Sequence, residues 1–587
     1  MKKINLIKYS DQLAIWLMEL GYTHYFYVGG GNIMHLTESL SKYLVGVPVV
    51  HEVAAGIAAE YFNEISENGR ALALVTTGPG ITNAVTAIAG AWLESRELLV
   101  IGGQVKTIDL ATNGLRARGI QEVNGVDLLR PTTKISRQIK EPIDAEDLRS
   151  VVSASWMPRK GPVFLEIPLD VQAANVEQQT ITKSDVGFVL PRIAAVDLEN
   201  VVARFNQSRK PILLIGGGVS YTLAMNLQSR FQEHQIPVMT TYNGADRIDG
   251  NASYYLGRPN TWGQRSSNIV IQQSDLIIAI GTRLGMQQTG FNWQEFGRDA
   301  YIVQIEIDPK ELSKGHPTVD QGLCVDADDF LKRFVSYKLT HHDRWLTYAQ
   351  KIRSAVPRVE NVNQTAQGYL SPYEFITTLE NLTFESDLII PCSSGSAFTL
   401  AMQLYKQKRG QRILTNKSLA SMGYGLSGAI GACIGGDNKR RTILIEGDGG
   451  FAQNMQEVGT AEINDLNLKM FIFHDQGHAS IRMTQKSYFK GKYLGCDRNS
   501  GLGLPRWHEL FKAWNVPFIE VNQGYENDPL FLKRFNEPGL CAFIVRIDPD
   551  QTYFPKISSR VTDTGSMESN PIDKMTPEID YLKGIDF

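Results

Sequence analysis

The sequence predicts an α/β protein built from three doubly wound domains, each with a parallel sheet covered by helices. The chain has 587 residues, enough for about three or four domains. Short apolar runs alternate with helical patterns along most of it, and glycine or turn residues follow each run. This alternation is typical of parallel strands that are joined by helices.

The strand-like runs fall into three groups, and the groups define the expected domains. An N-terminal domain, residues 1–175, contains the runs at 24–28, 47–51, 71–77, 98–103 and 162–168. A central domain, 191–336, contains 210–218, 276–283 and 301–309. A C-terminal domain, 371–548, contains 387–392, 441–449, 469–475 and 541–549. The first and third groups are similar in size and pattern, as two versions of one domain would be. The remaining segments read as a linker (176–190), a helix with a linker (337–370) and an ordered or semi-ordered tail (549–587).

Composition argues against several classes of function. The formal net charge of −3 disfavours a general affinity for nucleic acid or anionic membranes. The five cysteines are scattered and form no CxxC pair, which indicates a reducing compartment and no zinc cluster. The first 21 residues read as an amphipathic helix, not a signal peptide, and no apolar run approaches the roughly 18 residues of a membrane span. We therefore expect a cytoplasmic protein without nucleic-acid or membrane partners.

The strongest chemical signal lies in residues 441–477. An apolar run is followed by the turn Gly447-Asp448-Gly449-Gly450, a helix-like segment to about Asn464, a second apolar run, and Asp475. Such a unit places Asp448 and Asp475 just past the carboxyl ends of parallel strands, where α/β sheets bind ligands. Oxygen ligands beside a helix N-terminus suit a divalent cation that carries a diphosphate. GDG alone is a common turn, but the flanking strands and the second aspartate favour a metal site.

At these residues the chain resembles the thiamine diphosphate enzymes, and within them the acetolactate synthase-like (acetohydroxyacid synthase) family. The metal motif of that family is GDG followed downstream by asparagine. Several further runs agree with it in order along the chain: YVGGGNIMHL (27–36), VVHEVAAGIAAEYF (49–62), TTGPGITNAVTAI (76–88), GIQEVNGVDLLRPTTK (119–134), IDPKEL (307–312) and SMGYGLSGAIGA (421–432).

The resemblance gives Glu52 a catalytic role. Taken alone, Glu52 is a glutamate in the first turn of a helix, favoured there by the helix dipole. In the family, such a glutamate hydrogen-bonds the aminopyrimidine ring of the cofactor and promotes the tautomer that removes the thiazolium proton. Apolar neighbours such as Val53 and Ala54 fit the dry pocket that this role requires.

The resemblance assigns the other site residues as well. Gln121 would line the active site across a subunit interface, and His478 is either directed at the substrate or an ordinary loop histidine. Met422 would hold the cofactor bent, and the Ala420 carbonyl would accept from its amino group. The remaining implied positions are Gly29, Pro79 and Asn83 for the pyrimidine; Gly395, Ser396, Ala397, Gly449 and Gly450 for the cofactor's diphosphate side; and Asp448, Asp475 and the Gly477 carbonyl for Mg²⁺.

Three departures from the family pattern bear on the substrate and the metal. Asp475 stands where the family has asparagine; it can still bind magnesium but adds negative charge. Residues 394–405 read SGSAFTLAMQLY where acetolactate synthases usually carry Gln-His-Gln-Met-Trp, and Ile120 replaces a phenylalanine.

The central segment resembles the domain that holds FAD in acetolactate synthases. The matching positions are Gly216, Arg283, Asp308 and Asp326, although glycine turns beside strands are weak evidence on their own. The resemblance implies that FAD has a structural role, since the expected reaction involves no net redox change.

The implied activity is carboligation, by a transferase of aldehyde or ketone residues. Pyruvate would be decarboxylated, and its two-carbon acetyl unit would be added to an acceptor carbonyl. The departures, together with the C-terminal stretch 547–571, favour a ketone such as a keto-sugar nucleotide, as in a branched-sugar biosynthesis subgroup. The alternatives are an acetolactate synthase that condenses two 2-oxo acids and a non-catalytic cofactor-binding relative. The resemblance also implies a homodimer or homotetramer with sites at the subunit interface.

Overall fold

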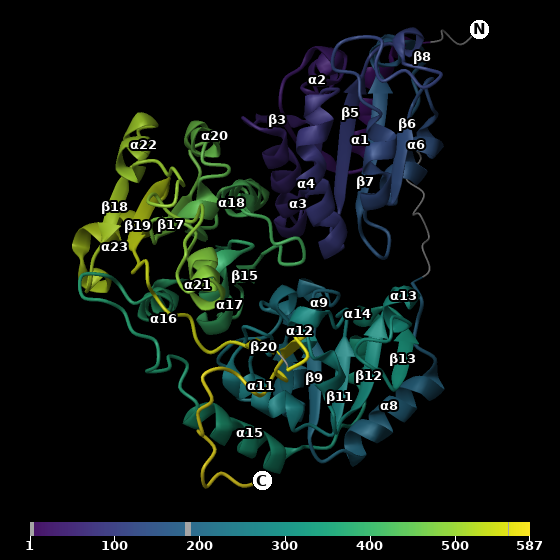
Figure 1. Cartoon of the computed structure of the whole chain (residues 1–587). Helices are drawn as coiled ribbons and strands as arrows, with labels where there is room; N and C mark the ends of the chain where they lie inside the picture. Colours follow the sequence, from purple (N-terminus) through teal and green to yellow (C-terminus); the bar gives the residue numbers. More distant parts are fainter. Residues whose placement is uncertain (1–4, 182–189, 562) are drawn as a thin grey trace.

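Three parallel sheets organise the chain, as expected from the sequence (Figure 1). The structure is a computed structural model and describes residues 5–181, 190–561 and 563–587. No described helix is long and apolar enough to cross a membrane. Part of the expected 176–190 linker, residues 182–189, lies outside the described residues; its beginning contributes β8 (Asn175–Glu177), which pairs antiparallel with β1 (Leu6–Lys8).

The N-terminal sheet has six strands in the order β3-β2-β4-β5-β7-β6. Its strands are β2 (Tyr22–Tyr27), β3 (Val45–Pro48), β4 (Arg70–Val75), β5 (Leu98–Gln104), β6 (Ile135–Gln138) and β7 (Pro162–Pro168). Its main helices are α1 (Tyr9–Glu19), α2 (Met34–Leu40), α3 (Glu52–Ile65), α4 (Pro79–Glu94), α5 (Gly125–Leu129) and α6 (Ala145–Ser153). The strand expected at 47–51 is wrong by a few residues: β3 ends at Pro48, and His51 is already the N-cap of α3.

The C-terminal sheet repeats this topology. Its order is β15-β14-β16-β17-β19-β18, so both sheets have the order 2-1-3-4-6-5 when strands are counted along the chain. The strands are β14 (Leu388–Pro391), β15 (Arg412–Ile413), β16 (Thr442–Gly447), β17 (Leu468–His474), β18 (Phe518–Val521) and β19 (Cys541–Arg546). The helices are α16 (Pro372–Leu382), α17 (Gly395–Leu404), α18 (Tyr424–Gly435), α19 (Asp448–Phe451), α20 (Glu457–Ile463), α21 (Ala479–Tyr488), α22 (Trp507–Ala513) and α23 (Pro529–Asn536). The single helix expected to reach Asn464 is wrong, because α19 and α20 are separate.

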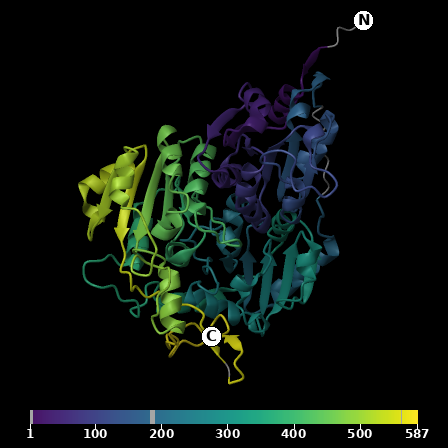
Figure 2. The same ribbon diagram turned by 45° about the horizontal axis from the view of Figure 1, so that its top comes forward.

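The central sheet has five parallel strands in the order β10-β9-β11-β12-β13. The strands are β9 (Pro211–Ile215), β10 (Val238–Thr240), β11 (Leu276–Ile280), β12 (Tyr301–Glu306) and β13 (Gln321–Cys324). The surrounding helices include α8 (Ala195–Gln207), α11 (Arg265–Gln272), α14 (Ala327–Phe334) and α15 (Asp343–Ala355). The tail crosses this domain and forms the hairpin of β20 (Ser559–Val561) and β21 (Met567–Ser569). Farther along the tail, Ile572 and Met575 are buried against α11. The tail appears in yellow over the central domain in Figures 1 and 2.

The N-terminal and C-terminal domains share one hydrophobic core. It contains side chains from both sheets, and α3 packs against α18 at its centre. A buried polar network crosses the same interface: Arg96 pairs with Glu60 (2.8 Å), the Tyr424 hydroxyl donates to Glu60 (2.7 Å), and Arg96 donates to the Thr415 carbonyl (2.6 Å). The two domains are therefore held together within one chain, and the starts of α3 and α18 are fixed relative to each other.

Candidate functional site

Asp448 and Asp475 form a buried pair of carboxylates at the edge of the C-terminal sheet. Asp448 begins α19 directly after β16, and Asp475 follows β17, which is the parallel neighbour of β16. The side chains are 0% and 2% exposed, and Asp448 Oδ1 and Asp475 Oδ1 are buried without hydrogen-bond partners in the described part of the chain. Burial raises the pKa of both groups, and the charge of Asp448 raises that of Asp475 further. Two unpartnered anionic oxygens of this kind fit a hard divalent cation.

The surroundings of the pair orient the carboxylates. His474 Nδ1 and Asp448 Oδ2 are 2.9 Å apart, and the Gln476 N–H donates to the same oxygen at 3.0 Å. Oδ1 is therefore left to face a ligand. The guanidinium of Arg482 donates to the backbone carbonyl of Asp475 at 3.2 Å and lowers the pKa of the Asp475 carboxyl. Arg482 thus offsets part of the charge that aspartate adds where asparagine was expected.

Gly477 and His478 lie against the GDG turn. A Cβ placed on Gly449 would be 2.2 Å from His478 Nδ1 and 3.1 Å from the Gly477 carbonyl oxygen. Glycine is needed at 449 because this approach is so close. In the described residues, no three His, Cys, Asp or Glu side chains form a metal-binding group. A cation here would therefore take its other ligands from backbone carbonyl and non-protein oxygens.

The expected diphosphate contacts lie at two helix starts beside this pair. Gly395 begins α17 after β14, with a φ of +80° and open space where a Cβ would be, while Ser396 and Ala397 are buried. Gly449 and Gly450 belong to the first turn of α19. The free N–H groups of such first turns can bind anionic oxygens. Since β14 and β16 are neighbours, both helix starts lie at the same sheet edge.

The loop before α18 carries the residues expected to support the cofactor. Ala420 has a φ of +55°, a left-handed conformation that is strained for a residue other than glycine. Met422 is 38% exposed although it is apolar. The loop is tied down on both sides, since Asn454 Nδ2 donates to the Gly423 carbonyl (2.7 Å) and the Ser393 hydroxyl donates to the Ser421 carbonyl.

The N-terminal domain brings together the residues expected to contact the pyrimidine. Glu52 is 8% exposed and accepts a hydrogen bond from Asn83 Nδ2 at 2.9 Å. Pro79 begins α4, which also carries Asn83. The Gln121 carbonyl accepts from the Thr77 hydroxyl (3.2 Å), and Gln121 has a left-handed φ of +62°. Gly29, just after β2, lies at the same sheet edge.

Glu166 supports this group, and sequence reasoning missed it. Gln104 Nε2 donates to Glu166 (3.1 Å), and Gln104 Oε1 accepts from Thr77, the residue that holds Gln121. Burial raises the pKa of Glu166 to about 7. A buried acidic residue within a strand was the only signal in the sequence.

Sequence patterns did not reveal three further residues near the Asp448–Asp475 carboxylate pair, which are His474, Arg482 and Tyr553. Tyr553 comes from the tail; its hydroxyl is buried and has no partner in the described residues. Burial and the negative charge of Asp475 raise the pKa of Tyr553. The tail therefore reaches the carboxylate pair. No local pattern could place a residue from the tail at this sheet edge.

The four positions matched to flavin binding have protein partners. A Cβ on Gly216 would lie 2.3 Å from the Gly281 carbonyl oxygen, so this glycine is explained by turn packing. Arg283 donates to the Ser418 hydroxyl, Asp308 pairs with Arg159 (2.7 Å), and Asp326 caps α14. These contacts account for the residues without a flavin and give no independent support for one.

Comparison with known proteins agrees with this geometry. Three domain models match: the thiamine pyrophosphate enzyme N-terminal TPP binding domain at residues 7–127, the central domain at 198–334 and the C-terminal TPP binding domain at 393–544. The chain is 26% identical to the acetolactate synthase isozyme 1 large subunit of Escherichia coli, over 92% of this chain and 93% of that protein. It is 28% identical to the acetolactate synthase large subunit of Lactococcus lactis, over 93% and 94%. It is 29% identical to that of Corynebacterium glutamicum, over 92% and 87%. Because a domain model of one family matches each of the three domains in order, the chain belongs to the thiamine pyrophosphate enzyme family.

Proposed function

We propose that this protein is a carboligase that decarboxylates pyruvate and adds the acetyl unit to an acceptor carbonyl. The carboxyl group leaves as carbon dioxide, a carbon–carbon bond forms to the acceptor carbonyl carbon, and the acceptor oxygen takes up a proton. Bound thiamine diphosphate would supply the electron sink for the decarboxylation. The observation that carries the proposal is the pair of unpartnered oxygens on Asp448 and Asp475, which fits a Mg²⁺–diphosphate group.

The protein's own residues have distinct roles in this proposal. Asp448, Asp475 and the Gly477 carbonyl would hold the cation, and the first turns of α17 and α19 would hold the diphosphate. Glu52, positioned by Asn83, would exchange a proton with the pyrimidine ring of the bound cofactor. Met422 supports the cofactor from its apolar side, and Gln121 and His478 face the substrate.

We propose a ketone acceptor such as a keto-sugar nucleotide. The first turn of α17 carries only the small residues Gly395, Ser396 and Ala397, while Phe398 is directed into the core against Tyr242. Gly395 adds no side chain to the open space beside it, which leaves room for a bulky acceptor. The polar groups of His478 and Tyr553 suit an acceptor that is rich in hydroxyl groups.

The second candidate is an acetolactate synthase, in which the acceptor is a second 2-oxo acid. Full-length similarity to three acetolactate synthases favours it. A third possibility is a non-catalytic cofactor-binding relative, which the Glu52–Asn83 hydrogen bond argues against.

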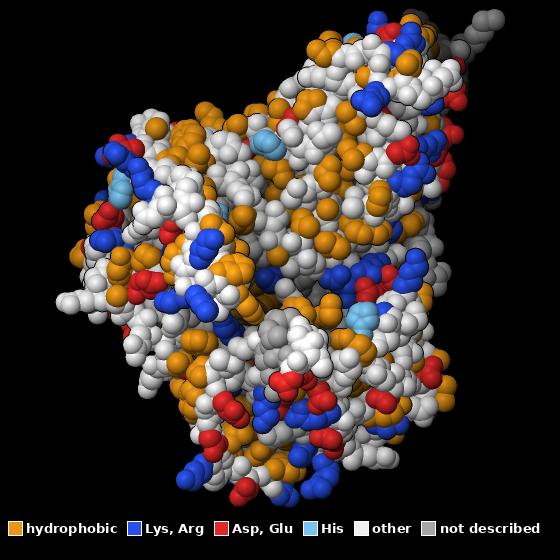
Figure 3. Space-filling view, in the orientation of Figure 1, with side chains coloured by type: hydrophobic (Ala, Val, Ile, Leu, Met, Phe, Trp, Pro, Cys, Tyr) orange, Lys and Arg blue, Asp and Glu red, His pale blue; other side chains and the backbone are white. Residues whose placement is uncertain are grey.

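We propose that two chains complete the sites, as a homodimer or within a homotetramer. Several apolar side chains beside the site residues are open to solvent in the single chain, among them Ile120 (84%), Val50 (58%) and Met422 (38%). Figure 3 shows apolar side chains spread over one face of the N-terminal domain. A second copy would cover such groups and gain the hydrophobic free energy of burying them. Sedimentation equilibrium that gives only a monomer would contradict this.

Product analysis tests the activity. The protein is incubated with thiamine diphosphate, Mg²⁺ and pyruvate, first alone and then with a panel of ketones. We expect the main product to be the branched 2-hydroxy ketone of an added acceptor. Strong acetolactate formation from pyruvate alone would favour the second candidate, and absence of cofactor binding would favour the non-catalytic one. An absorbance spectrum of the purified protein tests our remaining proposal that FAD is bound in a structural role.

A further inference from the structure

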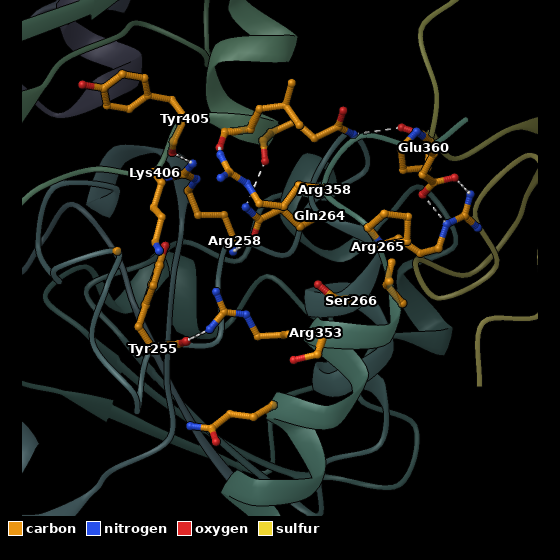
Figure 4. Close-up of a pocket in the computed structure, with 18 of the residues that line it drawn as sticks. Tyr255, Arg258, Gln264, Arg265, Ser266, Arg353, Arg358, Glu360, Tyr405 and Lys406 are labelled. Carbon is orange, nitrogen blue, oxygen red and sulfur yellow. Dashed lines mark hydrogen bonds and ion pairs between the residues drawn. The ribbon is translucent and has the colours of Figure 1, made fainter. Parts of the chain in front are cut away.

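A separate cavity of about 370 Å³ lies where the central domain, the C-terminal domain and the tail meet (Figure 4). Its walls come from the loop 250–264 and the start of α11, the end of α15 with the segment after it, and the end of α17 with the loop after it. None of the residues expected to bind cofactor, metal or flavin lines it. Its size is within the range of small-molecule sites, roughly 300–1,000 Å³.

The charged side chains in the wall of the cavity are mostly positive. Five cationic side chains line it: Arg258, Arg265, Arg353, Arg358 and Lys406. Glu360 is the one acidic residue in the wall, and Arg265 engages both of its oxygens at 2.7 and 2.9 Å. Arg358 likewise engages both oxygens of nearby Glu380, at 2.9 and 2.7 Å. The two carboxylates are therefore already neutralised by two of the arginines.

Three cations remain without an acidic partner. Among the described residues, no carboxylate lies within ion-pair distance of Arg258, Arg353 or Lys406. Burying charge without a counter-charge is costly, so this arrangement favours an anion from outside the protein.

Arg258 has a partial structural explanation. It is 1% exposed and donates only to neutral acceptors: the carbonyls of Met402 and Tyr405 and Gln407 Oε1. These carbonyls belong to the end of α17, where the helix dipole is negative, equivalent to about half a charge. The dipole explains the orientation of Arg258 and compensates only part of its charge.

The charges of Arg353 and Lys406 are compensated less fully. Arg353 lies in the last turn of α15, where the helix dipole is again negative, and its guanidinium lies 6.0 Å from the centre of the Tyr255 ring. Arg353 donates to the carbonyl of Tyr255, and its pKa lies below the usual value because of burial and the nearby guanidinium groups of Arg358 and Arg258. Lys406 is half-buried, and its backbone N–H, not its amino group, bonds Glu380. Figure 4 shows Arg258, Arg353 and Lys406 around the cavity, each from a different segment.

We propose that this cavity binds a small organic phosphate, held through its phosphate by Arg353 and Lys406. The planar fork of arginine matches phosphate oxygens, and lysine adds a compact charge. Val356, Pro357, Leu404 and Pro555 form an apolar part of the wall, against which the organic part of the ligand packs. The site is independent of the proposed activity, since it shares no residue with the cofactor crevice.

Calorimetry on the protein saturated with thiamine diphosphate and Mg²⁺ tests the proposal. The probes are ADP, glucose 6-phosphate and inorganic phosphate. We expect at least one organic phosphate to bind once per chain, more tightly than inorganic phosphate and more weakly as salt is added. Arg353→Gln and Lys406→Gln should each weaken binding about tenfold or more, because each removes a charge-assisted hydrogen bond. Lys439→Gln is the matched control, since this lysine is outside the cavity and its side chain is 79% exposed.

Three results would overturn the proposal: no saturable binding of either organic phosphate, inorganic phosphate binding as tightly as both, or binding that survives in the Arg353→Gln/Lys406→Gln double variant. A measurement on the unmodified protein covers the case in which the variants fail to fold. Acetylation of Lys406, followed by mass spectrometry with Lys439 as reference, should slow when the organic phosphate is added. Equal rates with and without it would also reject the site.

Discussion

Gly431 lies at the closest contact between α18 and α3, and its replacement by alanine should disturb both stability and catalysis. A Cβ at this position would be 2.0 Å from the Ala58 carbonyl oxygen and 2.6 Å from Ala58 Cα. Both atoms are backbone, so no side-chain rotation can relieve the clash. Restoring a normal contact of roughly 3.5 Å requires the helices to separate by about 1.5 Å.

The size of the effect follows from this displacement. Overpacking a core lowers the free energy of unfolding by about 1–3 kcal/mol. The higher helix propensity of alanine over glycine offsets up to about 1 kcal/mol of this loss. Because the obstacle is backbone, we expect a net loss of about 2 kcal/mol. The helix α3 begins at Glu52 and α18 follows Met422, and misplacing a catalytic group by 1 Å can cost about 10²-fold in rate.

Thermal unfolding and pyruvate turnover measure the two effects. Gly503→Ala is the control, because a Cβ there has no atom within 4 Å and its backbone is not left-handed. We expect a lowered melting temperature and reduced turnover for Gly431→Ala only. If both variants unfold and turn over alike, the helix contact does not have the role described here.

Three further changes test the site. Glu52→Gln should bind thiamine diphosphate and Mg²⁺ normally in calorimetry but lose about 10²-fold or more in turnover; activity near that of the unmodified enzyme would remove Glu52 from catalysis. Asp475→Asn removes a like charge beside Asp448, so the cofactor-free protein should melt at a higher temperature while Mg²⁺ alone binds more weakly; unchanged values in both would contradict the paired-carboxylate site. Burial raises the pKa of Glu166 from 4.5 to about 7, so the folded state favours the neutral acid. The stability that this preference contributes is complete below pH 4.5 and is lost as the pH rises through 7, by up to about 3 kcal/mol. Glu166→Gln should flatten unfolding curves measured across that range, and an unaltered pH profile would count against a neutral Glu166.

Local patterns were sufficient to predict the three sheets and the position of the buried carboxylate pair at the edge of one of them. The apolar runs before Gly447 and before His474 are parallel neighbours, so Asp448 and Asp475 had to lie at one edge. The ends of the strands were less predictable. Apolar residues continue past Pro48, but β3 ends there and the chain leads directly to His51, the N-cap of α3.

The partners of the site residues could not be predicted, because they depend on packing between distant segments. Arg482 belongs to α21 and donates to the backbone carbonyl of Asp475. Tyr553 comes to the same sheet edge from the tail. The cationic cavity has the same origin, since its charges come from three segments that lie far apart in the sequence. Sequence periodicity gives no information about such contacts between distant segments.

The repeated strand order relates the positions of two of the proposed site residues. In both outer domains, the helix that joins the second strand to the third is the one at the shared core: α3 in one and α18 in the other. Glu52 and Met422 therefore stand at equivalent helix starts in two copies of one architecture. If the proposed roles hold, equivalent positions of the two domains supply different groups to the cofactor, an acid from one and an apolar support from the other.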